Sequence, residues 1–270
     1  MSKRKTQARF RSWLRVWVGV GVVVAALCRG AAAQTDEIQV YDASIAAPGT
    51  LSLTLHNNYT PRGQSTPAFP GGLIPDKSLN GVAEWAYGVT NWFEAGLYLP
   101  LYSVSKDRGA TINGGKIRML FVAPNADKRT FFYGINFEFS YNTKHWDPST
   151  VTSEIRPIAG LHLHRWDFIV NPILDNSFAG GFKSLDFAPA SRVAYNFSQK
   201  WAVAAEEYAD LGTLRAIYPV DQQSHQIWAV FDHAAKWVNI ETGVGFGLTS
   251  ASDKLTLKLI LSRDLRARRH

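Results

Sequence analysis

Apolar and polar positions alternate along most of this chain, most clearly between Leu79 and Tyr102. One set of alternate residues there is wholly apolar and aromatic, whereas the other mixes small residues with Glu84 and Glu94. Because successive side chains of a strand point to opposite faces, this period predicts two strands joined at Thr90–Asn91. An apolar face opposite a sparsely polar one is typical of a membrane barrel, whose outer face meets lipid while the polar face lines the lumen.

The same alternation recurs to the C-terminal end, and its clearest example is the aromatic stretch Phe131–Tyr141. About 12 segments of this kind can be counted, most of them roughly ten residues long, as membrane strands are. Short connections follow Val89, Val122, Leu163, Phe197 and His233, and long connections follow Tyr59, Tyr102, Tyr141, Leu174 and Leu211. We therefore predict an all-β fold: an antiparallel transmembrane β-barrel of about 12 strands, with short periplasmic turns and longer outer loops.

The net charge of +7 comes from the N-terminal end alone. Seven of the 29 Lys and Arg residues lie within residues 1–33, which hold no acid, so the rest of the chain carries 22 charges of each sign. A basic start, an apolar run over Val16–Leu27 and small residues up to Ala33 predict a secretory signal peptide. The mature chain would then hold no cysteine, and its neutrality argues against nucleic acid as a partner. The expected division is a signal peptide at 1–33, a periplasmic lead at 34–49, the barrel at 50–265 and a basic tail at 266–270.

Tryptophan follows four of the five short turns. These residues are Trp92, Trp166, Trp201 and Trp237. Trp prefers the membrane–water interface, so we expect the four to form a girdle at one rim. Trp92 and Trp237 have the strand parity of the polar face, however, whereas Trp166 and Trp201 have that of the apolar face. A girdle does not explain this difference.

Charged residues of both signs occupy the predicted inward positions. They are Glu84, Glu94, Lys116, Arg118, Glu138, Glu154, Arg156, His162, Asp167, Asp186, Arg192, Glu206, Asp210 and Glu241. On neighbouring strands opposite signs face each other, as Lys116 and Arg118 face Glu138. Two interpretations stay open: a structural network that fills a narrow barrel, or the lining of a selective pore.

Several segments resemble a known family. They are Glu37–Tyr41 with Pro48–Gly49, Tyr87–Pro100, Phe131–Tyr141, Glu206–Gly212 and Gly243–Thr249. In these segments the chain resembles Gram-negative outer-membrane β-barrel proteins, of the transporter group that includes the phenol meta-cleavage (MetA-pathway) outer-membrane family. The resemblance covers essentially the whole mature chain. Its motifs are signatures of strands and turns, and none of them indicates a catalysed reaction. It implies an outer-membrane location and passage of small apolar or aromatic molecules.

The C-terminal residues depart from the pattern of such barrels. Outer-membrane barrels usually end on an aromatic residue that the insertion machinery reads, whereas this chain ends in Arg266–His270. Either the last strand stops near Leu265 and a basic tail follows, or insertion uses an internal signal.

The favoured function is a porin-like channel or transporter for small molecules, with outer-membrane lipid and the insertion machinery as partners and with no cofactor. A non-conducting structural or adhesive barrel with a sealed lumen is the main alternative, and a barrel-embedded hydrolase or a soluble periplasmic β-sandwich are others. Ser224–His225 is the pair that a hydrolase would use, although we expect nothing to orient the histidine. His162 and His164 share a strand face as metal ligands do, but no third ligand lies at an interpretable spacing, so we expect no metal site.

Overall fold

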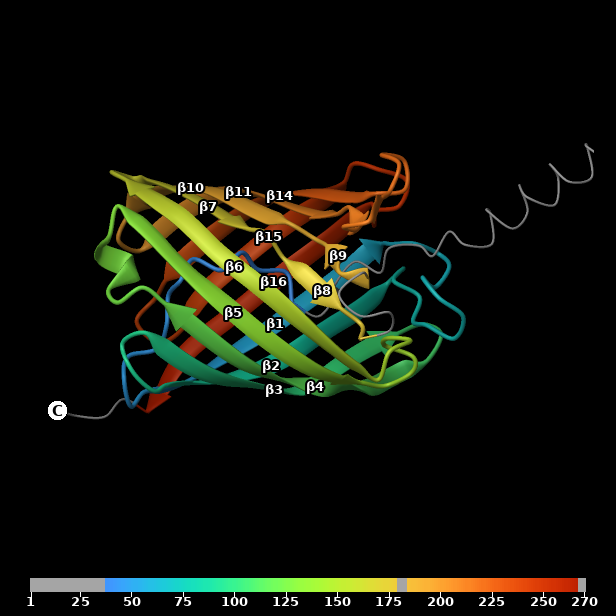
Figure 1. Cartoon of the computed structure of the whole chain (residues 1–270), viewed down its shortest axis with the longest axis horizontal. Helices are drawn as coiled ribbons and strands as arrows, with labels where there is room; N and C mark the ends of the chain where they lie inside the picture. The colour runs from blue at the N-terminus through green and yellow to red at the C-terminus, as the bar shows by residue number, and fades with distance from the viewer. Residues whose placement is uncertain (1–36, 179–183, 267–270) are drawn as a thin grey trace, which may run out of the picture. The chain divides into compact units, whose positions relative to one another are not determined.

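A computed structural model describes residues 37–178 and 184–266, whose strands form a closed antiparallel barrel (Figure 1). Its ring consists of β1 to β7, β10, β11 and β14 to β16, and it closes where β1 pairs with β16. These are twelve antiparallel strands, so the predicted fold class is confirmed. The predicted signal peptide at 1–33 and residues 267–270 of the predicted basic tail lie outside the described residues.

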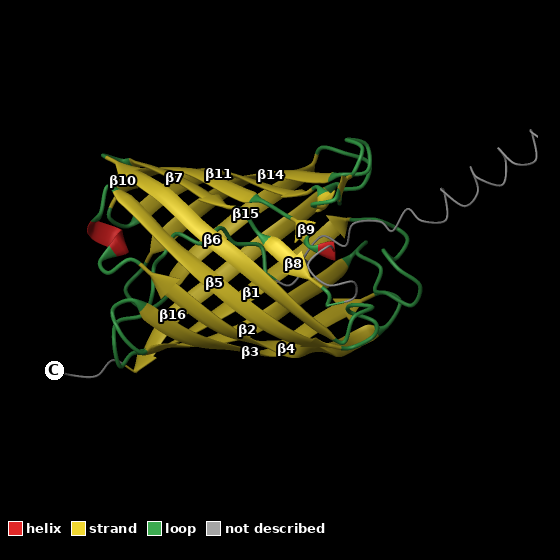
Figure 2. Ribbon diagram, in the orientation of Figure 1, coloured by secondary structure: helices red, strands yellow, loops and turns green. Residues whose placement is uncertain are grey.

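Nearly all described residues belong to strands or to their connections (Figure 2). The strands are β1 (Leu51–Arg62), β2 (Ser78–Gly88), β3 (Phe93–Ser105), β4 (Gly109–Val122), β5 (Phe131–Asn142), β6 (Val151–Leu163), β7 (Trp166–Asn171), β8 (Leu174–Asn176), β9 (Asp186–Phe187), β10 (Ala190–Ser198), β11 (Trp201–Asp210), β12 (Gly212–Thr213), β13 (Ala216–Ile217), β14 (Ser224–Ala234), β15 (Asn239–Gly247) and β16 (Leu255–Arg266), with a 3-10 turn η1 (Ala126–Lys128). Within the described ranges, no helix has the length and apolar character that crossing a membrane requires.

The four shortest strands extend the ring where longer strands are interrupted. β7 ends at Asn171 before Pro172, and β8 resumes at Leu174 against the same neighbour, β6. β9 and β10 are likewise separated at Pro189. Proline has no N–H to donate to the next strand, so the sheet ladder is broken at both places. β12 and β13 then continue the sheet beyond β9.

The barrel has a turn end and a loop end. At the turn end lie the connections β2–β3, β4–β5, β6–β7, β10–β11 and β14–β15, together with the start of β1 and the end of β16 (Figure 1). The expected long connection after Tyr102 is wrong. β3 and β4 stay paired up to Ser105 and Gly109, so only Lys106–Arg108 remain for the turn at the loop end.

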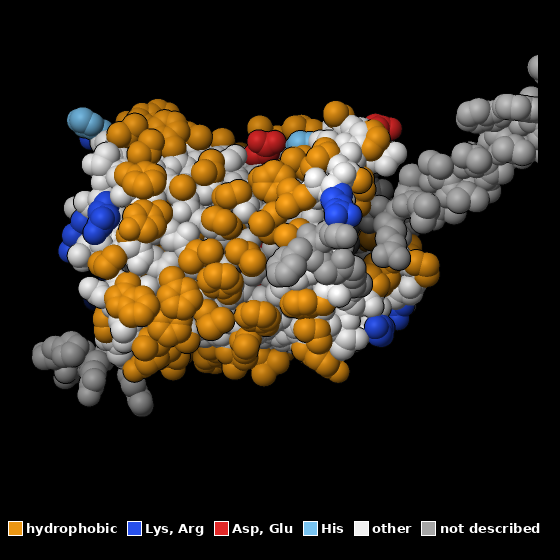
Figure 3. Space-filling model, in the orientation of Figure 1, with side chains coloured by type: hydrophobic (Ala, Val, Ile, Leu, Met, Phe, Trp, Pro, Cys, Tyr) orange, Lys and Arg blue, Asp and Glu red, His pale blue; other side chains and the backbone are white. Residues whose placement is uncertain are grey.

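The outer surface of the barrel is apolar. Hydrophobic side chains cover most of the face seen in Figure 3, whereas its Lys and Arg side chains lie toward the two ends. On β5 the side chains of Phe131, Tyr133 and Tyr141 are each more than half exposed, while Glu138 on the opposite face is 1% exposed. Such a large exposed apolar surface marks contact with lipid or with a partner, and this inside-out arrangement disfavours the soluble sandwich.

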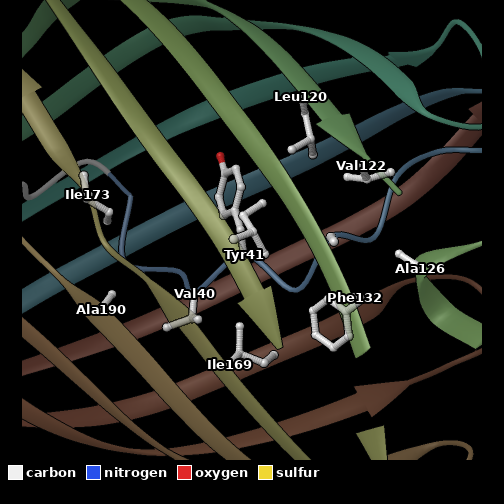
Figure 4. Close-up of a cluster of buried hydrophobic side chains, with 11 residues drawn as sticks. Val40, Tyr41, Leu120, Val122, Ala126, Phe132, Ile169, Ile173 and Ala190 are labelled. Carbon is white, nitrogen blue, oxygen red and sulfur yellow. The ribbon is translucent and has the colours of Figure 1, made fainter. Parts of the chain in front are cut away.

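Residues 37–47, called the lumen segment below, lie inside the barrel and correct one expectation. Val40 and Tyr41 are 5% exposed and pack with side chains of the wall, including Leu120 of β4 and Ile169 of β7 (Figure 4). The expected periplasmic lead at 34–49 is therefore wrong for its described part, because Ile38, Val40 and Tyr41 offer apolar surface that the lumen buries.

Candidate functional site

The lumen segment has no strand partner, so its main-chain groups need side chains as partners. Two cations from opposite walls supply them. Lys258 Nζ on β16 donates to the carbonyl oxygen of Ile38 at 3.2 Å. Arg156 Nη1 on β6 donates to the carbonyl oxygen of Gln39 at 3.1 Å. The segment is thereby fixed across the barrel.

Two further contacts hold the segment nearer the turn end. Asn171 of β7 binds both main-chain groups of Tyr41: its Oδ1 accepts from the N–H at 2.7 Å, and its Nδ2 donates to the carbonyl at 3.0 Å. The Ala46 N–H donates to Glu94 Oε2 at 2.5 Å. All these partners belong to the wall, so the segment is bound to the barrel by a small number of specific hydrogen bonds.

One charge network lies on β1 to β4. Arg118 reaches Glu84 at 2.7 Å and also pairs with Glu94. Glu84 in turn contacts His56 Nε2 at 3.0 Å. Arg118 is the register partner of Glu138, as the sequence suggested, but its long side chain pairs instead with these two glutamates.

The same network continues onto β5 and β6. Lys116 Nζ lies 3.4 Å from Glu138 Oε2, the pairing expected from the sequence. Arg156 binds Glu154 through two hydrogen bonds, of 2.7 and 3.1 Å. Tyr41 Oη donates to Glu138 at 3.3 Å, which connects this network to the lumen segment.

A second network lies on β10 to β16. Lys258 is fully buried and contacts Glu206 at 2.5 Å and Glu241 at 2.6 Å. Arg192 pairs with both Glu206 and Asp232. Buried ions persist when they are paired and hydrogen-bonded, and here every cation has at least two acidic or carbonyl partners. Both walls therefore carry fixed charge into the lumen.

The remaining predicted lumen residues lie near the ends of the barrel. His162 Nδ1 and Asp167 Oδ1 are 2.6 Å apart, and both side chains are partly exposed at the turn end. Asp210 accepts a hydrogen bond from the Gly212 N–H at 2.9 Å near the loop end. Asp186 is half-buried in β9.

Sequence reasoning missed several charged or polar lumen residues. They are Glu37, His56, Asn171, Asp232 and Lys258. Lys258 alternates with the leucines of β16, and Asp232 has the parity of Trp228 in β14, so the period-two pattern could have placed both inside. Nothing in the strand pattern places Glu37, because it lies in the lumen segment.

Two cavities lie in the lumen on either side of the segment. The loop-end cavity, about 80 Å³, is lined by residues such as Glu37, Asp175 and Asp253. The turn-end cavity, about 430 Å³, is lined by Arg118, the middle of the lumen segment and the last residues of β16. Gln39 lines both, so the lumen segment is what stands between them.

The connection between β1 and β2 lies against the other loops at the loop end. Gln64 N donates to Asp253 Oδ1 at 2.8 Å, and Leu73 N donates to the carbonyl of His145 at 3.1 Å. Arg108 of the β3–β4 turn donates to the Gly71 carbonyl at 2.7 Å. This connection is thus tied to three other connections at the loop end, and one of these contacts is to Asp253, which lines the loop-end cavity.

The four tryptophans of the predicted girdle are all exposed and all lie at the turn end. Trp166 and Trp201 begin β7 and β11. Trp92 and Trp237 lie in the turns just before β3 and β15, so strand parity does not apply to them. Lys236 Nζ lies 5.1 Å from the ring centroid of Trp237. Their interfacial role stays a prediction.

The Ser224–His225 pair does not form a nucleophile and base. Ser224 is 3% exposed and its hydroxyl contacts that of Ser252 at 3.3 Å. His225 contacts Glu207 Oε1 at 3.4 Å and Gln223 Oε1 at 2.9 Å, so the expectation that nothing orients the histidine is wrong. The two side chains lie on opposite faces of β14, however, which separates the hydroxyl from the imidazole.

No cluster of potential metal ligands occurs among the described residues. His162 lies in β6 with its ring stacked on Phe132, at a centroid distance of 4.4 Å. His164 lies beyond the end of β6, in a turn with φ of 57°. The two histidines therefore do not share one strand face.

Of the comparisons with known proteins, the one with solved structures agrees with the fold. No family model matches the chain, and no curated protein matches it. Among solved structures it is similar to an outer membrane channel from Pseudomonas putida F1, at 12% identity and a TM-score of 0.56, over 85% of this chain and 100% of that one. It is also similar to the KdgM porin, solved in complex with disordered oligogalacturonate, at 8% identity and a TM-score of 0.52, over 80% of this chain and 99% of that one. At these identities the likeness concerns the fold.

Proposed function

We propose that this protein is an outer-membrane channel or transporter for small solutes, exported by a signal peptide, with a lumen narrowed by its own N-terminal residues. The observation that carries the proposal is the pair of cavities inside a closed barrel, separated at Gln39 by a segment that is not part of the wall. A segment held by side-chain hydrogen bonds can shift without breaking the strand ladders of the barrel. The fold similarity to an outer membrane channel is compatible with this role.

A sealed, non-conducting barrel is the second candidate, and the close ion pairing favours it. Lys258, Arg118 and Arg156 each contact acidic partners, so the networks also serve as a polar core. The two candidates differ in one respect only, which is whether the lumen segment leaves a continuous path for solutes.

The solute class follows from the side chains that face the lumen. The family resemblance implies apolar or aromatic molecules, whereas the walls here carry charged side chains as well as apolar clusters. Oligogalacturonate, with which the KdgM porin was solved, is a chain of carboxylate-bearing sugars. The acidic side chains around the loop-end cavity oppose such a polyanion, so polar or cationic small molecules fit this lumen better.

Single-channel recording tests the proposal. The protein, purified in detergent from a Gram-negative host and added to a planar bilayer, is expected to give discrete and reproducible current steps, and these should be small because the lumen segment fills part of the lumen. Heat-modifiable migration on a gel would show that the sample is folded. Complete silence from folded protein would refute the channel and leave the sealed barrel.

A membrane position of the barrel predicts a depth-dependent cost for a charge on its outer face. Ile117→Arg, in the middle of β4, is expected to lower the unfolding free energy in lipid vesicles by about 2–4 kcal/mol. Ile112→Arg on the same strand, near the loop end, is the matched control and should cost roughly 0–1 kcal/mol. Urea unfolding followed by tryptophan fluorescence measures both, and equal costs would contradict the membrane position.

A further inference from the structure

The loop-end cavity is lined by acidic side chains and by apolar ones. Glu37, Asp175, Asp210 and Asp253 contribute carboxylates, and Arg156 is the one base among the lining residues that the structure describes. Ile38, Ile173, Ala188, Ala209 and Tyr208 add apolar and aromatic surface. Carboxylates grouped at low dielectric raise the local concentration of cations.

The carboxylate of Glu37 at this cavity has no hydrogen-bond donor among the described residues. Its side chain is 1% exposed, and neither carboxylate oxygen accepts a hydrogen bond from a residue in the described ranges. The nearest guanidinium nitrogen, Nη1 of Arg156, is 3.9 Å away. Arg156 is already bound to Glu154 and to the carbonyl of Gln39, so it leaves Glu37 only weakly compensated.

A buried carboxylate without donors is costly, and a ligand that bears N–H donors would offset that cost. Two other carboxylates at the cavity each accept one main-chain N–H through Oδ1: Asp253 from Gln64 at 2.8 Å, and Asp210 from Gly212 at 2.9 Å. The cavity therefore offers several acceptors to a ligand but only one positively charged side chain.

We propose that the loop-end cavity is a binding site for organic ammonium cations, with the ammonium group on Glu37 and the apolar body against Ile38 and Tyr208. An ammonium group supplies three N–H donors and a positive charge, which match the acceptors present. A cavity of about 80 Å³ holds several times the space that one buried water needs, which is enough for a short primary amine. This assignment deepens the proposed channel function, on which its role in transport rests.

Calorimetric titration with butylammonium chloride tests the site without an open pore. The folded full chain in detergent is expected to bind butylammonium saturably, and to give no heat of binding with 1-butanol or sodium butyrate. Glu37→Gln keeps the shape of the side chain and removes its charge, so binding should weaken about tenfold, the effect of one lost charge-assisted hydrogen bond. Asp175→Asn provides a second variant if Glu37→Gln does not fold, and it should also weaken binding, because it removes another of the carboxylates that line the cavity.

The matched control is Glu207→Gln, on the outer face of the barrel, where the side chain is 53% exposed. It should bind butylammonium as the unmodified chain does. Absence of binding to the unmodified chain, equal binding of butanol, or unchanged affinity in both Glu37→Gln and Asp175→Asn would each overturn the site. Saturable binding by a chain that conducts no current would instead support the site and refute only the channel.

Discussion

Removal of residues 37–47 is expected to raise the single-channel conductance several-fold and to merge the two cavities into one open lumen. Gln39 lines both cavities, so the lumen segment is the shared boundary between them. The barrel itself should still fold, because Arg118, Arg156 and Lys258 keep acidic partners on the wall when the segment is gone. Planar-bilayer recording of the deletion variant beside the unmodified chain measures the change.

A point variant tests whether the current depends on how firmly the lumen segment is held, and not only on whether the segment is present. Asn171→Ala removes both hydrogen bonds to the main chain of Tyr41 and should increase current fluctuations as the segment moves more freely. Asn196→Ala is the control, since Asn196 contacts Asp167 and the turn at the rim but not the segment. If the deletion leaves the conductance unchanged, the path lies elsewhere and the segment is structural only.

The fold followed from the sequence because the two faces of a barrel wall differ in polarity and successive residues of each strand alternate between them. Alternation in Phe131–Tyr141 predicted an apolar outer face, and the structure exposes Phe131 and Tyr133 while burying Glu138. Connection lengths were less reliable, as the tight Lys106–Arg108 turn shows, because polar strand ends at the rim resemble loops.

The candidate site could be predicted only in part from the strand pattern. Parity places a charge inside a barrel, but it does not say which partner a long side chain reaches, and Arg118 pairs with Glu84 and Glu94 rather than with Glu138. The lumen segment was missed for a different reason. Ile38 and Tyr41 belong to no strand, so no period marks them, and their burial depends on a lumen that exists only after the barrel closes.

Lys258→Met is expected to destabilise the barrel by about 3–5 kcal/mol, because it takes the nearest cation from Glu241 and leaves Glu206 and Glu241 with Arg192 alone. Lys258 is fully buried, lies 2.5 Å from Glu206 and 2.6 Å from Glu241, and also holds the carbonyl of Ile38. Urea unfolding in lipid vesicles, followed by tryptophan fluorescence, measures the loss. Lys254→Met serves as the control and should change little, since Lys254 is exposed and only donates to the Thr249 carbonyl.

The double variant Lys258→Met/Glu206→Gln decides between the two interpretations of the charged lumen that the sequence left open. In a structural network, neutralising Glu206 removes one of the two carboxylates that lose Lys258 and leaves Arg192 to compensate Glu241 and Asp232, so the double variant should regain part of the stability that Lys258→Met loses. Arg192 would then still hold Asp232, which keeps that side of the wall paired. If instead Lys258→Met unfolds like Lys254→Met but shifts the reversal potential in a salt gradient, these charges set ion selectivity and contribute little to holding the barrel together.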